Sequence, residues 1–267
     1  MILAAGTEVY RIGSPPVSGL GLSWTQKELD AGMKGPIPAV VFDDVGKADV
    51  TALLAGLAAT DFAKERLEQV LQTETETEPE PWRVGEAVAE TYLSHHRQCH
   101  FPWPDSRDER KSGSSLPGAD LVGIQQDCQG HRLAFGEVKT SSETKYPPNL
   151  LYGQEGLKKQ LEDLQGEASI REKLFEYLAL RATGKGWQAS FQTAAARYLQ
   201  NDRDVCIFGV LIRDVQPDGK DLKTRVSALA STNTAPMVVE LIAIYLPMGS
   251  IPTLGKEAVS TRKGGSA

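Results

Sequence analysis

Hydrophobic residues recur along this chain in two patterns, short continuous runs and helical spacings, which together predict an α/β protein. Runs bounded by glycine, proline and polar turn residues are typical of strands, and they occur at residues 117–123, 133–140, 204–212 and 238–246. Apolar positions spaced along one helix face predict helices at residues 82–98, 154–164, 169–181 and 188–200. The resulting order is a helix, a hairpin, three helices and two strands.

The first 72 residues are predicted to form a small α/β accessory portion. Residues 38–42 are continuously apolar and predict a strand, while Asp49 is suited to cap one helix and Leu67 to lie within a second. Residues 73–81 are acidic, low in complexity and end in proline, which is typical of an exposed linker. The prediction therefore places a core domain at residues 82–250 and a flexible tail at residues 251–267.

Composition indicates a globular protein rather than a membrane-spanning or disulfide-rich one. Hydrophobic residues make up 40% and charged residues 24% of the chain, as in ordinary globular domains. No apolar run approaches the roughly 18 residues of a membrane span, and the first residues lack the basic start of a signal peptide. The three cysteines form no CxxC motif, so we expect no disulfide framework, a cytoplasmic location and no membrane partner.

The net charge of −6 argues at first against a nucleic-acid partner, but the acidity is confined to one segment. Residues 43–90 carry twelve acidic and four basic side chains, whereas residues 91–267 carry twenty acidic and twenty-two basic ones. The chain beyond residue 90 is therefore slightly positive, which is compatible with a nucleic-acid substrate.

Charged residues interrupt the apolar pattern at one end of the predicted hairpin. If Cys128 and Gln129 form its two-residue loop, Asp120 lies directly opposite Glu137, with Cβ atoms roughly 4.5–5.5 Å apart. Lys139, two residues beyond Glu137, projects from the same face of the strand. A shift of the loop by one residue pairs Asp120 with Lys139 instead, and the three side chains still converge.

The burial expected for these strands affects how the charged cluster is interpreted. Both faces of residues 133–140 are apolar, as in a sheet covered by helices. Adjacent carboxylates are unfavourable there unless a cation compensates them, although a solvated strand end would explain the same charges without any function. Glu86, beside Gly85 on the preceding helix, is the favoured third carboxylate, and Glu90 one turn later is the alternative.

Basic loops flank this cluster in the sequence, one before Asp120 and one after Lys139. Mobile basic loops are suited to contact a phosphate backbone, although solvated loops carry the same residues. The candidates for such contacts are Arg107, Arg110, Lys111 and Lys145. A stretch of histidines and cysteine at residues 95–100 has i,i+4 spacings compatible with zinc, but a polar helix end explains it better.

The pattern of Asp120 followed by Glu137-Val138-Lys139 on the neighbouring strand resembles that of the PD-(D/E)xK nuclease superfamily. Two departures are that Ala119 stands where the motif has proline, and that Gln160 lacks the tyrosine four residues later found in RecB-like relatives. The resemblance covers about residues 82–165 and the strand at 204–212. It implies a restriction-endonuclease-like mixed sheet flanked by helices and metal-dependent hydrolysis of phosphodiester bonds.

The residues of the cluster suit that chemistry. Asp120, Glu137, the Val138 carbonyl and Glu86 would supply oxygen ligands for Mg²⁺, for which Mn²⁺ is a possible substitute. Lys139 would orient or deprotonate the attacking water, or neutralise charge on the phosphate. The expected substrate is nucleic acid, with DNA favoured.

A narrower resemblance concerns the stretches from Gly85 to Asp120 and from Gly136 to Ser141, which look like the small nuclease subunit of Hachiman-type anti-phage defence systems. That family works with a separate helicase subunit, so a helicase partner is expected. The alternative function is a catalytically silent nuclease-fold module that binds nucleic acid or a partner protein. The sequence lacks the GxSxG, HExxH and P-loop motifs of other hydrolases and of nucleotide-binding proteins.

Overall fold

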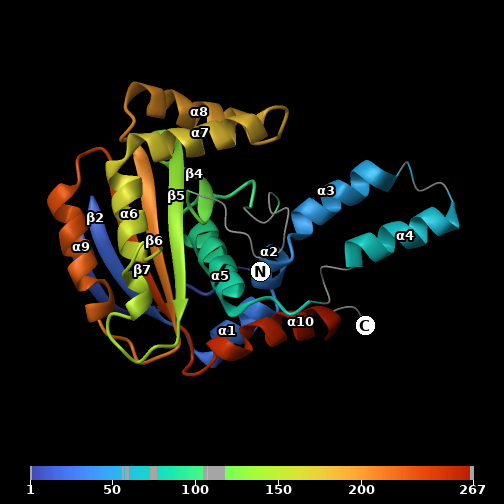
Figure 1. Cartoon of the computed structure of the whole chain (residues 1–267), viewed down its shortest axis with the longest axis horizontal. Coiled ribbons are helices and arrows are strands. Elements are labelled where there is room, and N and C mark those ends of the chain that lie inside the picture. Colours follow the sequence, from blue (N-terminus) through green and yellow to red (C-terminus); the bar gives the residue numbers. More distant parts are fainter. Residues whose placement is uncertain are drawn as a thin grey trace.

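The computed structural model of this protein describes residues 2–55, 57, 60–72, 77–104, 107 and 118–264. Seven strands of these residues form one mixed sheet in the order β1-β2-β7-β6-β5-β4-β3 (Figure 1). The strands are β1 (Thr7–Ser14), β2 (Val17–Ser23), β3 (Cys99–His100), β4 (Leu121–Asp127), β5 (Gly130–Ser141), β6 (Val205–Arg213) and β7 (Val238–Tyr245). The central neighbours β5, β6, β7 and β2 are parallel, whereas β1, β4 and β3 pair antiparallel at the two sides. The α/β class and the mixed sheet flanked by helices are thus as predicted.

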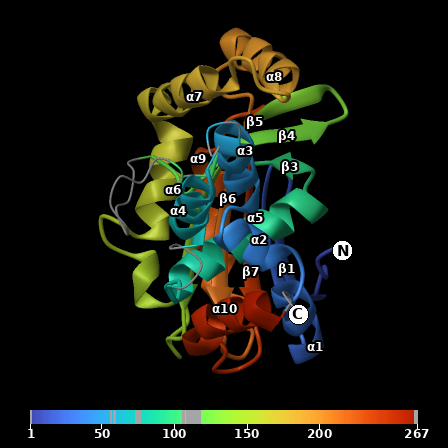
Figure 2. The ribbon, with the colours of Figure 1, turned by 90° about the vertical axis from the view of Figure 1, so that its right-hand side faces the viewer.

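Helices cover both faces of this sheet and bury its strands. One face packs against α1 (Gln26–Met33), α2 (Pro36–Val41), α5 (Pro81–His96) and α10 (Leu254–Gly264), which lie in front of the sheet in Figure 2. The other face packs against α6 (Leu157–Gly166), α7 (Ala168–Ala182), α8 (Gln188–Gln200) and α9 (Lys220–Thr232). Short 3₁₀ helices η2 (Asn149–Leu151) and η3 (Ile251–Thr253) lie in the connections. Every residue of β6 is buried, which explains why its sequence is apolar without alternation.

A glycine lets α6 lie close to the sheet beside the hairpin. Gly209 on β6 is the register partner of Glu137 on β5. A Cβ atom at Gly209 would lie 2.7 Å from a methyl group of Leu161, so a larger residue would push α6 away. The sheet is therefore tightly covered directly beside Glu137.

The N-terminal residues differ from the prediction. The strand expected at residues 38–42 is wrong, because Pro36 occupies the first turn of α2 and Ile37 is buried in the core. A short apolar run of this kind suits a strand and a buried helix equally well. In addition, β2 pairs with β7, so the first part of the chain belongs to the central sheet instead of forming an accessory portion.

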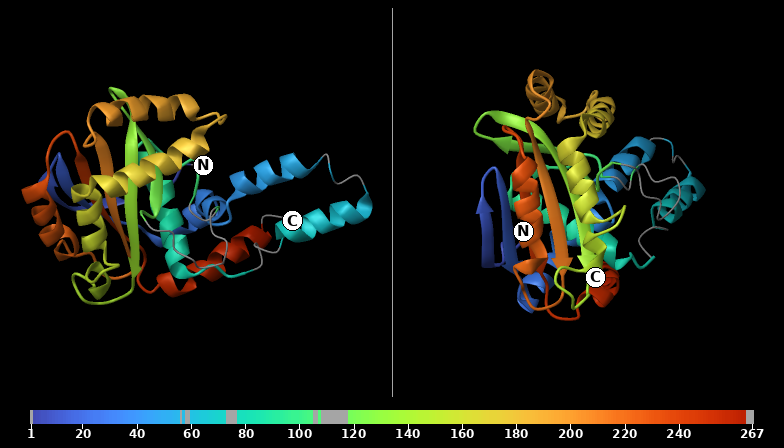
Figure 3. Two further views of the ribbon diagram at one scale, coloured as in Figure 1. Left: turned by 45° about the horizontal axis from the view of Figure 1, so that its top comes forward. Right: turned by 60° about the vertical axis from the view of Figure 1, so that its left-hand side comes forward.

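The two helices expected before residue 73 are present, as α3 (Asp44–Ala55) and α4 (Asp61–Gln72). Asp49 lies inside α3 and does not cap it, because the helix begins five residues earlier. Figures 1 and 3 show this pair projecting from the rest of the molecule. Of the expected linker, residues 73–76 lie outside the described residues, and α5 begins at Pro81.

The C-terminal residues form ordered helices where a flexible tail was expected. Leu254 and Ala258 of α10 are fully buried in the core cluster that also contains α5 and α2. The apolar positions were spaced too sparsely in the sequence to indicate this helix. No helix in the described ranges combines the length and the apolar character needed to cross a membrane.

Candidate metal and nucleic-acid site

The β4–β5 hairpin brings together the three charged residues expected from the sequence. Leu121 pairs with Gly136 and Asp127 pairs with Gly130, so the two-residue loop has the predicted register and Asp120 faces Glu137. The Lys139 ammonium nitrogen lies 3.8 Å from Asp120 Oδ2 and 3.7 Å from Glu137 Oε2. One cation thus lies between two carboxylates.

The main chain of β5 holds Asp120 in this position. The Val138 N–H donates a hydrogen bond of 2.7 Å to Asp120 Oδ2. Since Asp120 immediately precedes β4, this bond ties the entry of one strand to the middle of the next. Val138 was expected to offer its carbonyl as a ligand, and the structure shows that its amide positions the neighbouring carboxylate.

Glu137 is the most buried member of the cluster. Its side chain is 1% exposed, compared with 19% for Asp120 and 21% for Lys139. Neither Glu137 oxygen accepts a hydrogen bond from any described residue. Burial, and then the negative charge of Asp120, raise the pKa of Glu137 well above its usual range, while Lys139 opposes this effect.

The oxygen atoms of this cluster are suitable ligands for a hard divalent cation. A divalent cation would favour the ionised form of Glu137, whose two oxygens receive no hydrogen bond from the described residues and would then be able to coordinate that cation. Carboxylate and carbonyl oxygens are the ligands that Mg²⁺ prefers. However, within the described residues no three or more His, Cys, Asp and Glu side chains are grouped closely enough to hold a metal ion. Asp120, Glu137 and the Val138 carbonyl would therefore be completed by water or substrate.

The two candidate helical glutamates occupy different surroundings. Gly85 does allow the close approach predicted for α5, because a Cβ atom there would lie 2.0 Å from Thr140 Oγ1 on β5. Glu86 forms an ion pair of 3.4 Å with Arg83. Glu90, one turn later, lines the same pocket as Asp120. Glu90 therefore lies beside the same pocket as Asp120, while the charged residues that act on it are Asp43, Arg83 and Arg107.

The environment of Glu90 also sets its protonation. Desolvation, and then the charge of Asp43, raise its pKa to about 7, and Arg83 and Arg107 oppose this shift. A carboxyl group with such a pKa is neutral or ionised depending on modest changes in pH. Functional sites are enriched in groups of this kind.

A scan against models of protein families gives no match, and a search of curated proteins gives no match either.

The predicted basic contacts are only partly available to a ligand. Arg107 forms a bidentate ion pair with Asp43, at 2.7 and 2.8 Å, so its charge is already compensated. Arg110 and Lys111 lie outside the described residues. Lys145 is exposed, and its ammonium group donates a 2.6 Å hydrogen bond to Asn149 Oδ1.

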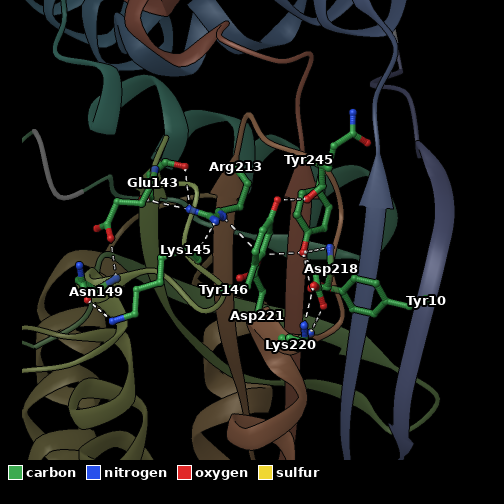
Figure 4. A network of polar contacts seen from close by, with 12 residues as sticks. Tyr10, Glu143, Lys145, Tyr146, Asn149, Arg213, Asp218, Lys220, Asp221 and Tyr245 are labelled. Atoms are coloured by element: carbon green, nitrogen blue, oxygen red, sulfur yellow. Dashed lines mark hydrogen bonds and ion pairs between the residues drawn. The ribbon is translucent and has the colours of Figure 1, made fainter.

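A buried arginine anchors the loop that carries Lys145, as Figure 4 shows. Arg213, at the end of β6, donates hydrogen bonds to the carbonyl oxygens of Ser141 and Lys145, at 3.2 and 3.0 Å. It also forms a fully buried ion pair of 3.3 Å with Asp221, which in turn accepts a 2.8 Å bond from the Tyr245 hydroxyl. The chain that follows Lys139 is thereby fixed to the core. The sequence signal for this network was the single arginine at the end of an otherwise apolar strand, and nothing in the local pattern indicated Asp221 as its partner.

The histidine-rich stretch has a structural role. His95 Nδ1 accepts a 2.8 Å hydrogen bond from the Leu3 N–H, and His96 Nε2 lies 3.0 Å from the Leu3 carbonyl oxygen. Cys99 Sγ donates to the Arg97 carbonyl oxygen. These contacts tie the N-terminal segment to the end of α5 and favour the polar helix end over a zinc face.

Proposed function

We propose that this protein is a metal-dependent nuclease that hydrolyses phosphodiester bonds in nucleic acid, with DNA as the favoured substrate. The observation that carries the proposal is the buried Glu137, whose two oxygens lack hydrogen-bond donors beside Asp120 and Lys139. A structural ion pair would normally satisfy such a carboxylate with donors.

The proposed chemistry assigns a role to each member of the cluster. Asp120, Glu137 and the Val138 carbonyl would hold Mg²⁺ or Mn²⁺, with water or substrate completing the coordination, and Glu90 adds negative charge beside Asp120 without belonging to the ligand set. When bound, the metal supplies Lewis-acid polarisation of the phosphate and a lower pKa for a bound water. Lys139, placed between the two carboxylates, would orient an attacking water and offset negative charge that develops on the phosphate.

A helicase partner remains part of the proposal. The sequence contains no P-loop motif, so movement along nucleic acid would depend on a separate subunit. The resemblance to the nuclease subunit of a two-component anti-phage defence complex supports this arrangement. A neighbouring gene that encodes no helicase would count against it.

A substrate panel tests the activity itself. The purified protein is incubated with single- and double-stranded DNA and RNA, in Mg²⁺ or Mn²⁺ and in parallel with EDTA. We expect cleavage of at least one substrate that EDTA abolishes. Cleavage unaffected by EDTA, or none with any metal and any nucleic acid, contradicts the proposal.

The second candidate is a nuclease-fold module that binds nucleic acid or protein without cleaving. One observation favours it: the described residues offer no cluster of three metal-binding side chains. In that case nucleic acid binds equally well with and without divalent metal, and Glu137→Gln leaves binding unchanged. A nuclease instead cleaves nucleic acid when divalent metal is present, and Glu137→Gln abolishes that cleavage.

A further inference from the structure

A second pocket, the Tyr152 pocket, lies between the first turns of α6 and the chain that enters this helix. Its volume is about 290 Å³, and its walls are Tyr152, Gly153, Gln154, Lys158, Lys159 and Glu162. Tyr152 is 48% exposed, so part of its ring is open to solvent. The volume is near the lower end of the range for small-molecule pockets, about 300–1,000 Å³. An aromatic ring, an amide and a lysine thus surround a space suited to one small planar group.

Backbone contacts hold Tyr152 in place. Its N–H donates a 2.9 Å hydrogen bond to the Asn149 carbonyl oxygen at the start of η2. A Cβ atom at Gly156 would lie 2.4 Å from the Tyr152 carbonyl oxygen, so a glycine is needed where the chain turns into α6. The wall of the pocket is therefore formed before any ligand binds, which lowers the entropy lost on binding.

Lys158 gives the Tyr152 pocket a positive charge. Of the other charged wall residues, Lys159 forms an ion pair with Asp163, and Glu162 forms one of 2.8 Å with Arg225. No carboxylate in the described ranges lies within ion-pair distance of Lys158. An uncompensated ammonium group beside an exposed aromatic ring is suited to a ligand that carries both a negative charge and a planar group.

The helix that forms the pocket also covers the sheet beside Glu137. Leu161 of α6 packs against Gly209, the register partner of Glu137. Lys158 comes three residues before Leu161, which is about 4.5 Å along the helix axis. Figure 1 shows α6 running alongside β5 and β6. The carboxylate cluster and the Tyr152 pocket therefore belong to one packed unit of helix and sheet.

The chain between Lys139 and the pocket is braced, as Figure 4 shows. The Asn149 N–H donates a 3.0 Å hydrogen bond to Glu143 Oε2, and the Lys145 ammonium group donates one of 2.6 Å to Asn149 Oδ1. The loop that connects the two sites is therefore held in one conformation and carries an exposed cation.

We propose that the Tyr152 pocket receives one base of a single-stranded nucleic acid, which stacks on Tyr152 while Lys158 contacts the adjoining phosphate. This inference rests on the proposed nuclease function, because the base belongs to a nucleotide a few positions from the phosphate cleaved at Asp120 and Glu137. Stacking on an aromatic ring requires a base that has left its own stack, so the substrate is a single strand at this point. The Gln154 amide offers a donor and an acceptor for the edge of the base.

Binding in EDTA tests the pocket separately from cleavage. Fluorescence anisotropy with labelled single-stranded DNA, single-stranded RNA and duplex DNA gives the dissociation constants. Tyr152→Ala should weaken binding of the preferred single strand roughly five- to 150-fold, as expected for the loss of one stacked base. Tyr152→Phe keeps the ring and should retain most of the affinity, and duplex DNA should bind both variants as it binds the wild type.

Matched variants separate the pocket from general effects of charge and apolar surface. Lys158→Ala should lower the slope of log K against log salt by about 0.7, as expected for one phosphate contact on a single strand. Lys27→Ala removes an exposed lysine of α1, on the opposite face of the sheet, and Phe62→Ala removes an exposed ring of α4. Both controls should bind as the wild type does. If Tyr152→Ala binds every oligonucleotide as Phe62→Ala does, or loses as much affinity for duplex as for single strands, the base pocket is wrong.

The outcomes also distinguish this inference from the proposed function. A wild-type protein that cleaves in Mg²⁺, with Tyr152→Ala and Phe62→Ala equal in binding, keeps the nuclease and removes the base pocket. A wild-type protein that never cleaves, while Tyr152→Ala alone weakens single-strand binding, keeps the base pocket and removes the nuclease. A wild-type protein that neither binds nor cleaves removes both.

Discussion

Replacing Glu137 with glutamine should stabilise the metal-free protein while abolishing its response to divalent metal. At an effective dielectric constant of about 20, the attraction across the 3.7 Å between Lys139 and Glu137 is about 4.5 kcal/mol. The repulsion between Glu137 and Asp120 opposes this attraction and is one cause of the raised pKa of Glu137. The desolvation penalty of a buried carboxylate, several kcal/mol, is therefore left largely uncompensated.

The glutamine removes both charge terms and the ionic desolvation penalty, but it leaves a buried amide that costs about 1–3 kcal/mol. We expect a net gain of about 1–3 kcal/mol in the free energy of unfolding, with each kcal/mol raising Tm by about 2–4 °C for a chain of this size. Thermal unfolding in EDTA measures this gain, and unfolding in Mg²⁺ measures the stabilisation by metal. Wild-type protein should gain Tm with Mg²⁺, and Glu137→Gln should not.

The pH dependence of the free energy of unfolding gives a second test of the Glu137→Gln substitution. Because burial raises the pKa of folded Glu137 above its ordinary value of 4.5, the folded state binds more protons than the unfolded state. The metal-free wild type should therefore lose stability as pH rises above about 4.5, and Glu137→Gln should lose less. Glu172→Gln, an exposed glutamate of α7, is the control and should behave as wild type. A Glu137→Gln protein that is less stable than wild type in EDTA refutes this reasoning.

Three further predictions follow from other parts of the site. Lys139→Ala should remain folded by circular dichroism and lose about 10²–10³ in cleavage rate, since it removes one electrostatic group at the reacting phosphate; wild-type rates would show that Lys139 takes no part. Because the pKa of Glu90 is about 7, metal affinity measured by calorimetry should rise between pH 6 and pH 8, and Glu90→Gln should flatten that rise; an unchanged profile would exclude Glu90 from the site. Arg213→Met should lower the free energy of urea unfolding by about 3–5 kcal/mol, because Asp221 is left buried without its partner; a loss below 1 kcal/mol would contradict the anchoring role.

The hairpin could be predicted in detail because its determinants are local. A two-residue loop fixes the register of an antiparallel pair, and that register alone places Asp120 opposite Glu137. The alternation of side chains then brings Lys139 to the same face. The central strands could be predicted equally well, since β6 is buried on both faces and its residues from Val205 to Ile212 are all apolar.

Features that depend on long-range packing could not be predicted in the same way. Whether Glu86 or Glu90 faces Asp120 depends on how α5 is rotated against the sheet, and helical spacing gives both residues the same direction. β1 is mostly exposed and β2 is rich in glycine, so neither has the pattern of a central strand, although β2 lies beside β7. The contact of Trp103 with Arg181 joins distant parts of the chain, and no local pattern indicates it.

The most direct test of the central claim compares cleavage of labelled nucleic acid in Mg²⁺ by wild-type protein, Glu137→Gln and Glu172→Gln at equal concentration. The proposal predicts that the wild type and Glu172→Gln cleave at similar rates, whereas folded Glu137→Gln shows no cleavage above the EDTA background. Equal cleavage by all three proteins would show that the buried carboxylate of the hairpin is not the centre of the reaction.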